Sequence, residues 1–301
     1  MISNLLTHVM LFLIKGLSYL PFSVLYAISD FLYFLIYRVF KYRLKVVRGN
    51  IKSAFPNKTD GEIKSIEQGF YRHLCDLIVE SVKLFSISAN ELNRRFKTIN
   101  PEHTEAYFNQ GKSLIGVTGH YNSWEMLALS LNLHHKHQAM GIYKKIKNPV
   151  MNKAMIKSRG KFDIILADTK HTNEMFDSNK NQVTITGFVA DQWPSNIHKC
   201  YWTLFLGRET AVSYGTEHYA RKYDMGVVFA KIRKVKRGFY EAEYITIADD
   251  VNKFQPGEIT KAHTKALENL ILEDPQYWVW SHKRWKRERP EEVPMETVFA
   301  Q

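Results

Sequence analysis

The stretch SLIGVTGHYNSWEMLALSLNLH, residues 113–134, changes its texture in the middle. Residues 113–119 form a short apolar run, which predicts a buried strand. Residues 123–134 instead repeat apolar side chains at helical spacing. His120 lies where the strand ends, and Glu125 lies in the first turn of the helix. A strand followed directly by a helix is typical of α/β domains, so this stretch indicates the fold class. It also raises the question whether His120 and Glu125 form a catalytic pair.

The same alternation of strands and helices continues on both sides of this stretch. We expect further strands at residues 138–143, 162–167 and 183–190, and a strand pair over residues 226–247 that turns near Arg237-Gly238. Helices are expected at residues 149–159, 210–224 and 256–274, after a long amphipathic helix in residues 57–86 that begins with a capping box at Thr59 and Glu62. The pattern predicts an α/β fold with a mixed central sheet flanked by helices.

The first fifty residues are the most apolar part of the chain. Lys15, Pro21 and Asp30 interrupt them, so two helical pieces that meet near Pro21 fit better than one clean span. No small-residue cleavage site follows, and a removed signal peptide is therefore not expected. The division we expect is a membrane-anchoring helical segment at residues 1–45 and a single domain at residues 46–301, since no linker rich in Pro, Gly or Ser divides the remainder.

Basic residues without acidic neighbours follow the apolar run. They are Arg38, Lys41, Arg43, Lys45, Arg48 and Lys52, with aromatic residues interleaved. Basic side chains beside an apolar segment mark the cytoplasmic side of a membrane and attract anionic headgroups. Membrane anchoring is the interpretation we favour, and the alternative is a buried N-terminal hairpin of a soluble protein.

Composition limits the function classes. With 45% hydrophobic and 24% charged residues, the 301-residue chain can bury a core and is not disordered. The net charge of +12 favours an anionic partner, which is nucleic acid, an anionic membrane face or a phosphorylated substrate. The two cysteines, Cys75 and Cys200, lie far apart and form neither a disulfide framework nor a metal-binding pattern. We expect no metal site and no cofactor.

His120 and Glu125 have two interpretations. In the plain one, Asn122 and Glu125 form a helix capping box and His120 is a satisfied polar residue. In the other, His120 is a general base, because ligand sites in open α/β sheets lie beyond the carboxyl ends of the strands and a neutral imidazole accepts a proton near neutral pH. The chain shows no G-x-S-x-G nucleophile elbow. A base without a protein nucleophile indicates direct transfer of a group to a hydroxyl of the substrate.

Several motifs together resemble one enzyme family. His120-Tyr-Asn-Ser-Trp-Glu125 resembles the H-x-x-x-x-D/E signature of the glycerolipid and lysophospholipid acyltransferase superfamily. More narrowly, the chain resembles the bacterial lipid A biosynthesis late acyltransferases, the lauroyl/myristoyl acyltransferase family. The segments that carry this narrower likeness are RGNIKSAFPN at 48–57, Glu80, VADQWP at 189–194, FLGRET at 205–210 and YWVWSHKRWK at 277–286.

The resemblance implies a specific activity. The protein is expected to be a membrane-bound O-acyltransferase of lipopolysaccharide synthesis, which moves a fatty acyl chain from acyl carrier protein, or from acyl-CoA, to a hydroxyl of a lipid A precursor. His120 would be the general base and Glu125 its orienting partner. Residues 46–301 would be the acyltransferase domain, on the cytoplasmic face of the bacterial inner membrane. Related acceptors, such as a lysophospholipid, a glycolipid mannoside or an amino-acid lipid, remain an alternative.

Three further residues are candidates for binding the substrate. Arg159 belongs to a basic run, residues 126–162, that contains no acidic residue, and its guanidinium can bind phosphate through two hydrogen bonds. Asp191 ends the strand at 183–190, at the same kind of sheet edge as His120. Arg208 follows Gly207, and glycine permits close approach of the backbone to a ligand.

Two functions of other classes compete with acyl transfer. The net charge and the basic aromatic tail at 277–286 also suit a protein that binds single-stranded nucleic acid, although the apolar N-terminus favours a membrane surface. A structural membrane protein without catalysis is the other alternative. We expect a lipid acceptor, an acyl donor and the membrane as partners, and no nucleic acid.

Overall fold

Seven strands form the central sheet in the computed structural model, which describes residues 2–194 and 200–298 and, for residues 2–5, the backbone alone. The order across the sheet is β1-β9-β8-β2-β5-β3-β4. Neighbouring strands are parallel except β8 and β9, which form an antiparallel hairpin. The strands are β1 (Phe96–Thr98), β2 (Leu114–Thr118), β3 (Gln138–Tyr143), β4 (Ile165–Asp168), β5 (Thr184–Val189), β8 (Gly226–Lys236) and β9 (Phe239–Ala248). The sheet is mixed, and the predicted α/β fold is confirmed.

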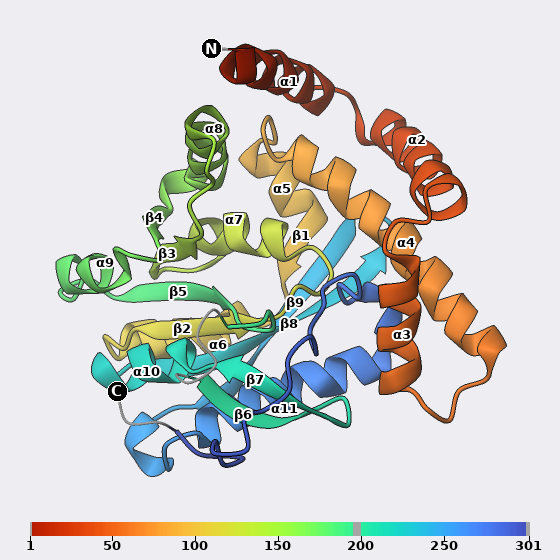
Figure 1. Ribbon diagram of the computed structural model, residues 1–301. Coiled ribbons are helices and arrows are strands. Elements are labelled where there is room, and N and C mark those ends of the chain that lie inside the picture. Colours follow the sequence, from red (N-terminus) through yellow and green to blue (C-terminus); the bar gives the residue numbers. More distant parts are fainter. Residues whose placement is uncertain (1, 195–199, 299–301) are drawn as a thin grey trace.

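Helices cover both faces of the sheet (Figure 1). They are α1 (Ile2–Ser18), α2 (Phe22–Tyr33), α3 (Leu44–Ala54), α4 (Asp60–Lys83), α5 (Ala89–Arg95), α6 (Pro101–Asn109), α7 (Trp124–His134), α8 (Pro149–Arg159), α9 (Thr172–Ser178), α10 (Gly215–Lys222) and α11 (Glu258–Glu273). The π-helix η1 (Phe34–Val39) continues α2, and single 3-10 turns lie at Lys161–Asp163, Val251–Lys253 and Pro275–Tyr277. In Figure 1, α4, α5 and α7 lie above the sheet, whereas α10 and α11 lie below it.

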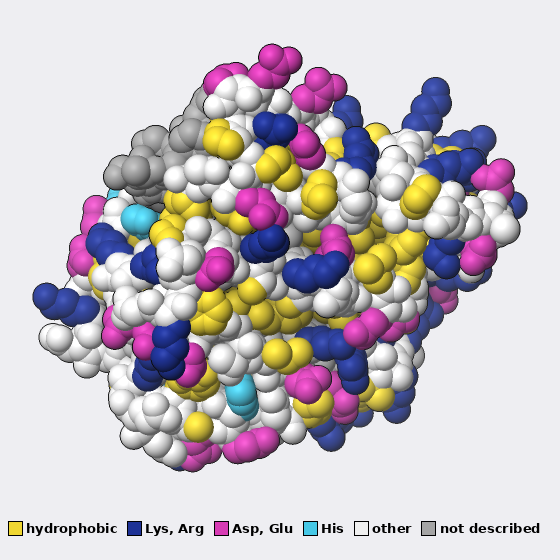
Figure 2. Space-filling view, turned by 90° about the horizontal axis from the view of Figure 1, so that it is seen from below, with side chains coloured by type: hydrophobic (Ala, Val, Ile, Leu, Met, Phe, Trp, Pro, Cys, Tyr) yellow, Lys and Arg dark blue, Asp and Glu magenta, His cyan; other side chains and the backbone are white. Residues whose placement is uncertain are grey.

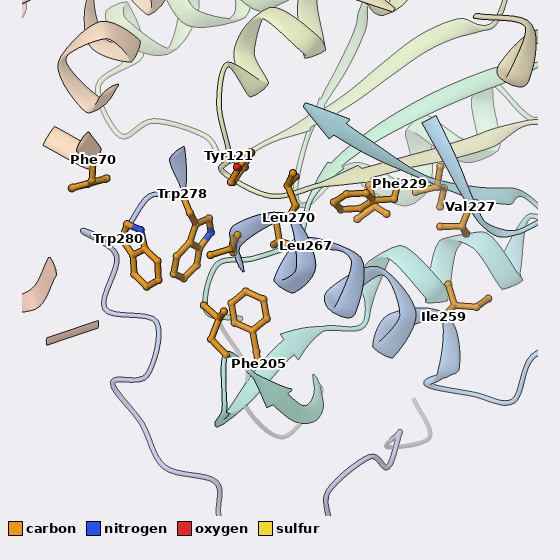
Figure 3. Close-up of a cluster of buried hydrophobic side chains, with 14 of the residues drawn as sticks. Phe70, Tyr121, Phe205, Val227, Phe229, Ile259, Leu267, Leu270, Trp278 and Trp280 are labelled. Carbon is orange, nitrogen blue, oxygen red and sulfur yellow. The ribbon is translucent and has the colours of Figure 1, made fainter. Parts of the chain in front are cut away.

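Two apolar layers hold the helices on the sheet. On one face, Leu127, Leu129 and Leu131 of α7 join the buried cluster that contains Ile185 and Val228. On the other face, α11 and the C-terminal segment pack against β2 and β8, where Figure 3 shows Leu267, Leu270 and Trp278 close to Phe229 and Phe205. The sheet is thus buried on both sides, as a largely parallel sheet requires.

One predicted helix is wrong at its start. Residues 210–213 of the expected helix 210–224 belong to strand β7 (Arg208–Ser213), which pairs with β6 (Cys200–Phe205) in a separate antiparallel hairpin, and only Gly215–Lys222 is helical. The β-branched Thr210 and Val212 are buried in that hairpin. Pairing with the neighbouring strand β6, across the two-residue turn Leu206-Gly207, therefore outweighs the helical pattern.

The N-terminal helices meet where the sequence indicated. Helix α1 ends at Ser18 and α2 begins at Phe22, with Pro21 at the N-cap position. Many of their large apolar side chains are exposed, including Phe12, Phe31, Phe34 and Phe40. This exposure contradicts the alternative of a buried hairpin, because exposed apolar surface of this extent needs another cover.

Length and composition qualify one helix for crossing a membrane. Within the part of the chain that the structure describes, only Phe22–Val39, which comprises α2 and η1, passes this test, and 22% of its 18 residues are buried. The other residues of this helix are half-buried or exposed. Whether residues 1–45 form a separate anchoring unit stays a prediction.

The apolar helix α2 is joined to the rest of the molecule by polar contacts. Tyr26 donates a hydrogen bond to Glu80 of α4 over 2.9 Å, and Arg237, at the turn of the β8–β9 hairpin, contacts both Asp30 and Asp76. Gly238 has φ +75°, and a Cβ there would lie 1.9 Å from the Tyr26 hydroxyl. The turn therefore needs glycine both for its backbone and for the close approach of α2.

Candidate active site

The register of two neighbouring strands brings His120 and Asp191 together. Strands β2 and β5 are parallel, and Thr118 lies opposite Val189. His120 and Asp191 each follow two residues after this pair, so both lie beyond the carboxyl ends of the strands. Gly119 allows the arrangement, because a Cβ at this position would lie 2.7 Å from the Leu267 methyl groups of α11.

Asp191 accepts three hydrogen bonds. Its Oδ1 lies 2.6 Å from Nδ1 of His120, and its Oδ2 accepts from the backbone N–H of His120 over 3.0 Å and from the Trp278 indole over 2.7 Å. The Asp191 side chain is only 3% exposed. Because both oxygens are held, the carboxylate fixes the orientation of the His120 ring.

The two charges of this pair stabilise each other. Burial pushes the pKa of Asp191 upward, but the His120 charge and the three donors outweigh it and hold the pKa at about 2. Burial likewise pushes the pKa of His120 downward, but the charge of Asp191, the hydrogen bond and the charge of Glu125 raise it above its ordinary value. Asp191 is thus a fixed anion, and His120 is a stronger base than an isolated buried imidazole.

The free ring nitrogen of His120 faces the side chain of Gln192. The Gln192 amide nitrogen lies 3.1 Å from Nε2 of His120, and Gln192 is exposed. With the amide nitrogen as the donor, Nε2 carries the lone pair and Nδ1 carries the proton, next to Asp191. In this tautomer, Nε2 can accept a proton from a substrate hydroxyl that takes the place of Gln192.

Glu125 is not the hydrogen-bonded partner that the motif implied for His120. The guanidinium of Arg159 donates hydrogen bonds to both carboxylate oxygens of Glu125, and its Nε lies 3.1 Å from Oε2. The carboxylate on the His120 ring is Asp191 instead, while Glu125 acts on His120 through its charge alone. Arg159 therefore pairs with Glu125 in this structure, and the role of phosphate contact that the sequence suggested for it stays a prediction.

Asn122 does not cap helix α7. Its φ is +51°, its side chain donates to the carbonyl of Ile232 over 2.9 Å, and its backbone N–H bonds to Tyr277. The N-cap position belongs to Ser123, whose side chain makes no capping bond. The capping-box interpretation of Asn122 and Glu125 is wrong, because Asn122 serves instead to anchor the loop that carries His120 to β8 and the C-terminal segment.

An apolar cavity of about 330 Å³ opens at His120. His120, Trp124, Glu125, Lys144 and Arg159 contribute its polar and aromatic part. The remainder is lined by side chains of α7, β3, β4, β5 and β8, among them Leu127, Leu131, Met140, Ile164, Ile185 and Ala230. The volume lies within the range of about 300–1,000 Å³ that is usual for ligand sites. A long apolar ligand with a reactive polar end fits this distribution.

The C-terminal segment contacts both His120 and Asp191, and its Trp278 and Trp280 are not surface residues. Trp278 and Trp280 are 1% and 0% exposed, and their rings lie 4.7 Å apart. Trp278 binds Asp191, and the backbone N–H of Val279 donates to the carbonyl of His120 over 3.2 Å. The expectation that these aromatic residues lie on a membrane or stack on bases is wrong for both tryptophans, which belong to the core.

Arg208 lies away from the His120 cavity. It lines a second hollow with Lys45, Lys283 and Lys286, and its guanidinium lies 4.9 Å from the centre of the Trp285 ring. Among residues 2–194 and 200–298, no group of three or more His, Cys, Asp or Glu side chains is arranged to hold a metal ion. The structure thus brings together His120, Glu125, Arg159 and Asp191 and leaves Arg208 apart.

The roles of Trp278 and Gln192 did not emerge from the sequence. Both lie within segments that resemble the acyltransferase family, VADQWP and YWVWSHKRWK, and this was the only signal for them. Their contacts depend on how β5 and the C-terminal segment are placed beside β2, which no local pattern reveals.

Comparison with known proteins defines the family. The family described as "Bacterial lipid A biosynthesis acyltransferase" matches residues 1–287. The chain is 21% identical over 254 residues to the "Lipid A biosynthesis acyltransferase" of Haemophilus influenzae, covering 84% of this chain and 80% of that protein. It is 23% identical over 278 residues to the "Lipid A biosynthesis lauroyltransferase" of Escherichia coli, covering 91% and 89%.

The protein has an α/β fold, with the His120–Asp191 pair at the opening of an apolar cavity. Its relatives identify it as an acyltransferase. The chain belongs to the bacterial lipid A biosynthesis acyltransferase family. The family resemblance seen in the sequence is thereby confirmed.

Proposed function

We propose that this protein transfers a fatty acyl chain from a thioester to a hydroxyl of a lipid A precursor, with His120 as the general base. The observation that carries the proposal is the position of the His120–Asp191 pair at the opening of the 330 Å³ apolar cavity. This geometry supports a reaction between a polar group at the opening and a long apolar group inside.

The cavity suits the acyl chain of the donor. Its inner lining is aliphatic, and burial of each methylene group contributes about 0.8 kcal/mol. A chain with a dozen or so carbons therefore gains enough binding energy to hold the thioester carbonyl at the opening. Gly116, Gly141 and Gly187 form part of the wall, and the absence of side chains there leaves room along the sheet.

The His120–Asp191 pair supplies the proton transfer. As the acceptor hydroxyl oxygen attacks the thioester carbonyl carbon, its proton passes to Nε2 of His120. Collapse of the tetrahedral intermediate breaks the C–S bond, and the imidazolium returns the proton to the departing thiolate. Asp191 stabilises the imidazolium between the two steps, since its own pKa is held at about 2 and it stays charged.

The donor and the location follow from the same proposal. The donor would be an acyl carrier protein, with acyl-CoA as the alternative, because both present the chain as a thioester that a histidine base can use. The exposed apolar helix Phe22–Val39 would hold the enzyme in the inner membrane, and the basic residues after it would face the cytoplasm. The lipid acceptor would then enter from the membrane.

Replacement of His120 by alanine tests the base. We expect His120→Ala to lower kcat/KM for acyl transfer by about 10²–10⁴-fold, the usual contribution of a general base. Product is measured by mass spectrometry of a lipid A precursor incubated with purified, full-length enzyme and an acyl thioester. His171→Ala is the matched control, because His171 forms a similar pair with Asp168 (2.8 Å) that is exposed and outside the cavity.

The result can contradict the proposal in two ways. Near-normal transfer by folded His120→Ala would remove His120 from the chemistry. A wild-type enzyme that acylates a lysophospholipid, a mannoside or an amino-acid lipid but no lipid A precursor would replace the acceptor.

A further inference from the structure

Four basic side chains converge on a second hollow of about 340 Å³ that is separate from the His120 cavity. They come from three segments far apart in the sequence: Lys45 from α3, Arg208 from the start of β7, and Lys283 and Lys286 from the C-terminal segment. The other lining residues are Val46, Gly49, Asn50, Ser53 and Trp285. The lining contains no acidic residue, so the hollow has an uncompensated positive potential.

These four cations have no ionic partners within the described parts of the chain. Nearby basic residues do have them: Lys52 pairs with Asp60 at 2.6 Å, and Arg48 pairs with Glu67 at 2.8 Å. Lys45, Lys283 and Lys286 are exposed, whereas Arg208 is half-buried over the Trp285 ring. In Figure 2, many Lys and Arg side chains gather toward the right of the molecule, the side on which Figure 1 places α3 and α4. Four like charges that repel one another are stabilised when an anion joins them.

The walls of the hollow are held rigidly. Asn50 of α3 donates from its amide to the carbonyls of Trp280 and His282, each over 2.9 Å, and Arg43 donates to the carbonyl of Ser281 over 2.9 Å. These contacts fix α3 against the C-terminal segment that carries Lys283 and Lys286. Arg208 is oriented by Trp285, whose ring lies 6.1 Å from that of Trp278. The segments that carry the cations, and the side chain of Arg208, are therefore positioned before any ligand arrives.

The hollow lies near both the catalytic pair and the apolar surface. Val279 bonds to His120, and Lys283 follows Val279 by four residues, so at most about 14 Å separates the Cα atoms of Val279 and Lys283. His282 is close enough to both sites to be affected by each. Burial is the main cause that lowers its pKa, and the charges of His120 and Lys286 lower the pKa further. On the other side, exposed Val39, Phe40 and Tyr42 immediately precede α3. An anion in the hollow would thus sit at the polar end of a membrane-bound lipid.

We propose that this hollow binds a phosphate group on the headgroup of the lipid acceptor, and that Arg208, Lys45, Lys283 and Lys286 hold it while His120 reaches the hydroxyl. The inference rests on the proposed acyl transfer to a lipid, and it assigns the phosphate contact to this hollow in place of Arg159, which pairs with Glu125. Guanidinium and ammonium groups together suit a phosphate, because the guanidinium bonds to two oxygens and the ammonium groups add charge.

Binding is tested without turnover. Full-length protein in detergent micelles is titrated with a phosphorylated glycolipid and with the same glycolipid after removal of the phosphate. We expect the wild type to prefer the phosphorylated form by about tenfold, and Arg208→Gln and the double variant Lys283→Gln/Lys286→Gln to lose this preference. Lys52→Gln, on the same helix as Lys45 but paired with Asp60, should keep it. No preference in the wild type, or a preference that survives in both variants, would overturn the proposal.

Competition identifies the source of the phosphate. Inorganic phosphate should displace the glycolipid, whereas vesicles of phosphatidylglycerol at equal phosphate concentration should displace it far less. Equal displacement by the vesicles would make the hollow a general contact with anionic membrane and would overturn its assignment to the acceptor. Arg208→Lys, which keeps the charge but loses the planar fork, should lie between the wild type and Arg208→Gln.

Kinetics separate this inference from the function on which it rests. In acyl transfer, the double variant should raise the KM of the phosphorylated acceptor about tenfold and leave the KM of the donor unchanged. If the wild type transfers no acyl chain, the proposed function fails, and the binding experiment still decides on the phosphate site. Equal shifts in both KM values would contradict a contact that is specific for the acceptor.

Discussion

Asp191 and Glu80 are both buried carboxylates, only 7% and 1% exposed, but their charge states differ. The pKa of Asp191 is held at about 2, whereas burial raises the pKa of Glu80 to about 7. The difference lies in the donors. Asp191 receives hydrogen bonds from the His120 ring, a backbone N–H and an indole, while Glu80 receives its hydrogen bonds from two phenols, Tyr26 and Tyr240.

A charged donor decides which of these carboxylates stays ionised. The imidazolium of His120 outweighs the cost of burying Asp191, whereas neutral hydroxyls do not outweigh that cost for Glu80, which the charge of Asp76 disfavours further. Burial alone therefore does not predict function. Asp191 stays an anion beside His120, whereas Glu80, with a pKa of about 7, takes up a proton near neutral pH at the contact between α2 and α4.

The largest effect is expected for Asp191→Asn, which removes the anion and keeps the shape. We expect kcat/KM to fall by about 10²–10⁴-fold, because the ring loses its tautomer and its stabilising charge. Asp191 raises the pKa of His120, so its removal lowers that pKa, and the acidic limb of the pH profile should move to lower pH. The profile of kcat/KM against pH measures both changes.

Asp168→Asn, which removes the exposed partner of His171, provides the control and should leave the profile unchanged. An acidic limb that stays in place in Asp191→Asn would show that His120 is not the titrating base.

A smaller effect, on stability, is expected for Glu80→Gln. The folded-state pKa of about 7 exceeds the ordinary 4.5, so the folded protein binds the extra proton between these values and loses stability as pH rises through them. Full ionisation would cost roughly 2–4 kcal/mol. Glutamine cannot ionise, and this decline should largely disappear. Denaturant unfolding of detergent-solubilised protein between pH 4.5 and pH 8 measures the slope.

The matched control for this measurement is Glu102→Gln, which alters an exposed glutamate at the start of α6. Its slope should equal that of the wild type. The expectation is contradicted if the stability of the wild type rises between pH 5 and pH 7 and Glu80→Gln shows the same slope. Glu80 would then be ionised in the folded protein, like Asp191.

The smallest effect is expected for the half-exposed pair of Glu125 and Arg159. Glu125→Gln should lower kcat/KM about tenfold or less, because Glu125 acts on His120 only through its charge and the pair is partly screened by solvent. Arg159→Gln should cost a similar amount, and the double variant should cost little more than either single variant, since one contact is lost in all three. A hundredfold loss in Glu125→Gln alone would return Glu125 to the role of direct partner of His120.

Local patterns predicted much of the fold. The strand and helix around His120, the hairpin that turns at Arg237-Gly238 and the capping box at Thr59 each depend on contacts within a few residues, and the structure confirms them. The start of the expected helix 210–224 failed, because residues 210–213 pair with β6 across the turn at Leu206-Gly207. Gly207 is a local signal for such a turn, but its position had been interpreted as room for a ligand.

The site was predictable in its residues and not in its pairings. His120 and Asp191 were both assigned to the carboxyl edge of a sheet, but their contact requires that β2 and β5 be neighbours, and strand order is not a local property. Likewise, Glu125 lies five residues from His120 in sequence, and yet α8 delivers Arg159 to it from 34 residues away. Proximity in sequence suggested Glu125 as the partner of His120, whereas the carboxylate that bonds to its ring is that of Asp191.

The support of Asp191 by Trp278 has a consequence for biosynthesis. A ribosome releases the chain from the N-terminus, so the apolar helices and the His120 loop emerge long before residues 277–286. Until then, the indole that holds Asp191, the backbone N–H that holds His120 and two of the four cations of the second hollow are missing. If the proposed function is correct, the nascent chain therefore lacks the groups that hold its catalytic pair until translation is nearly finished.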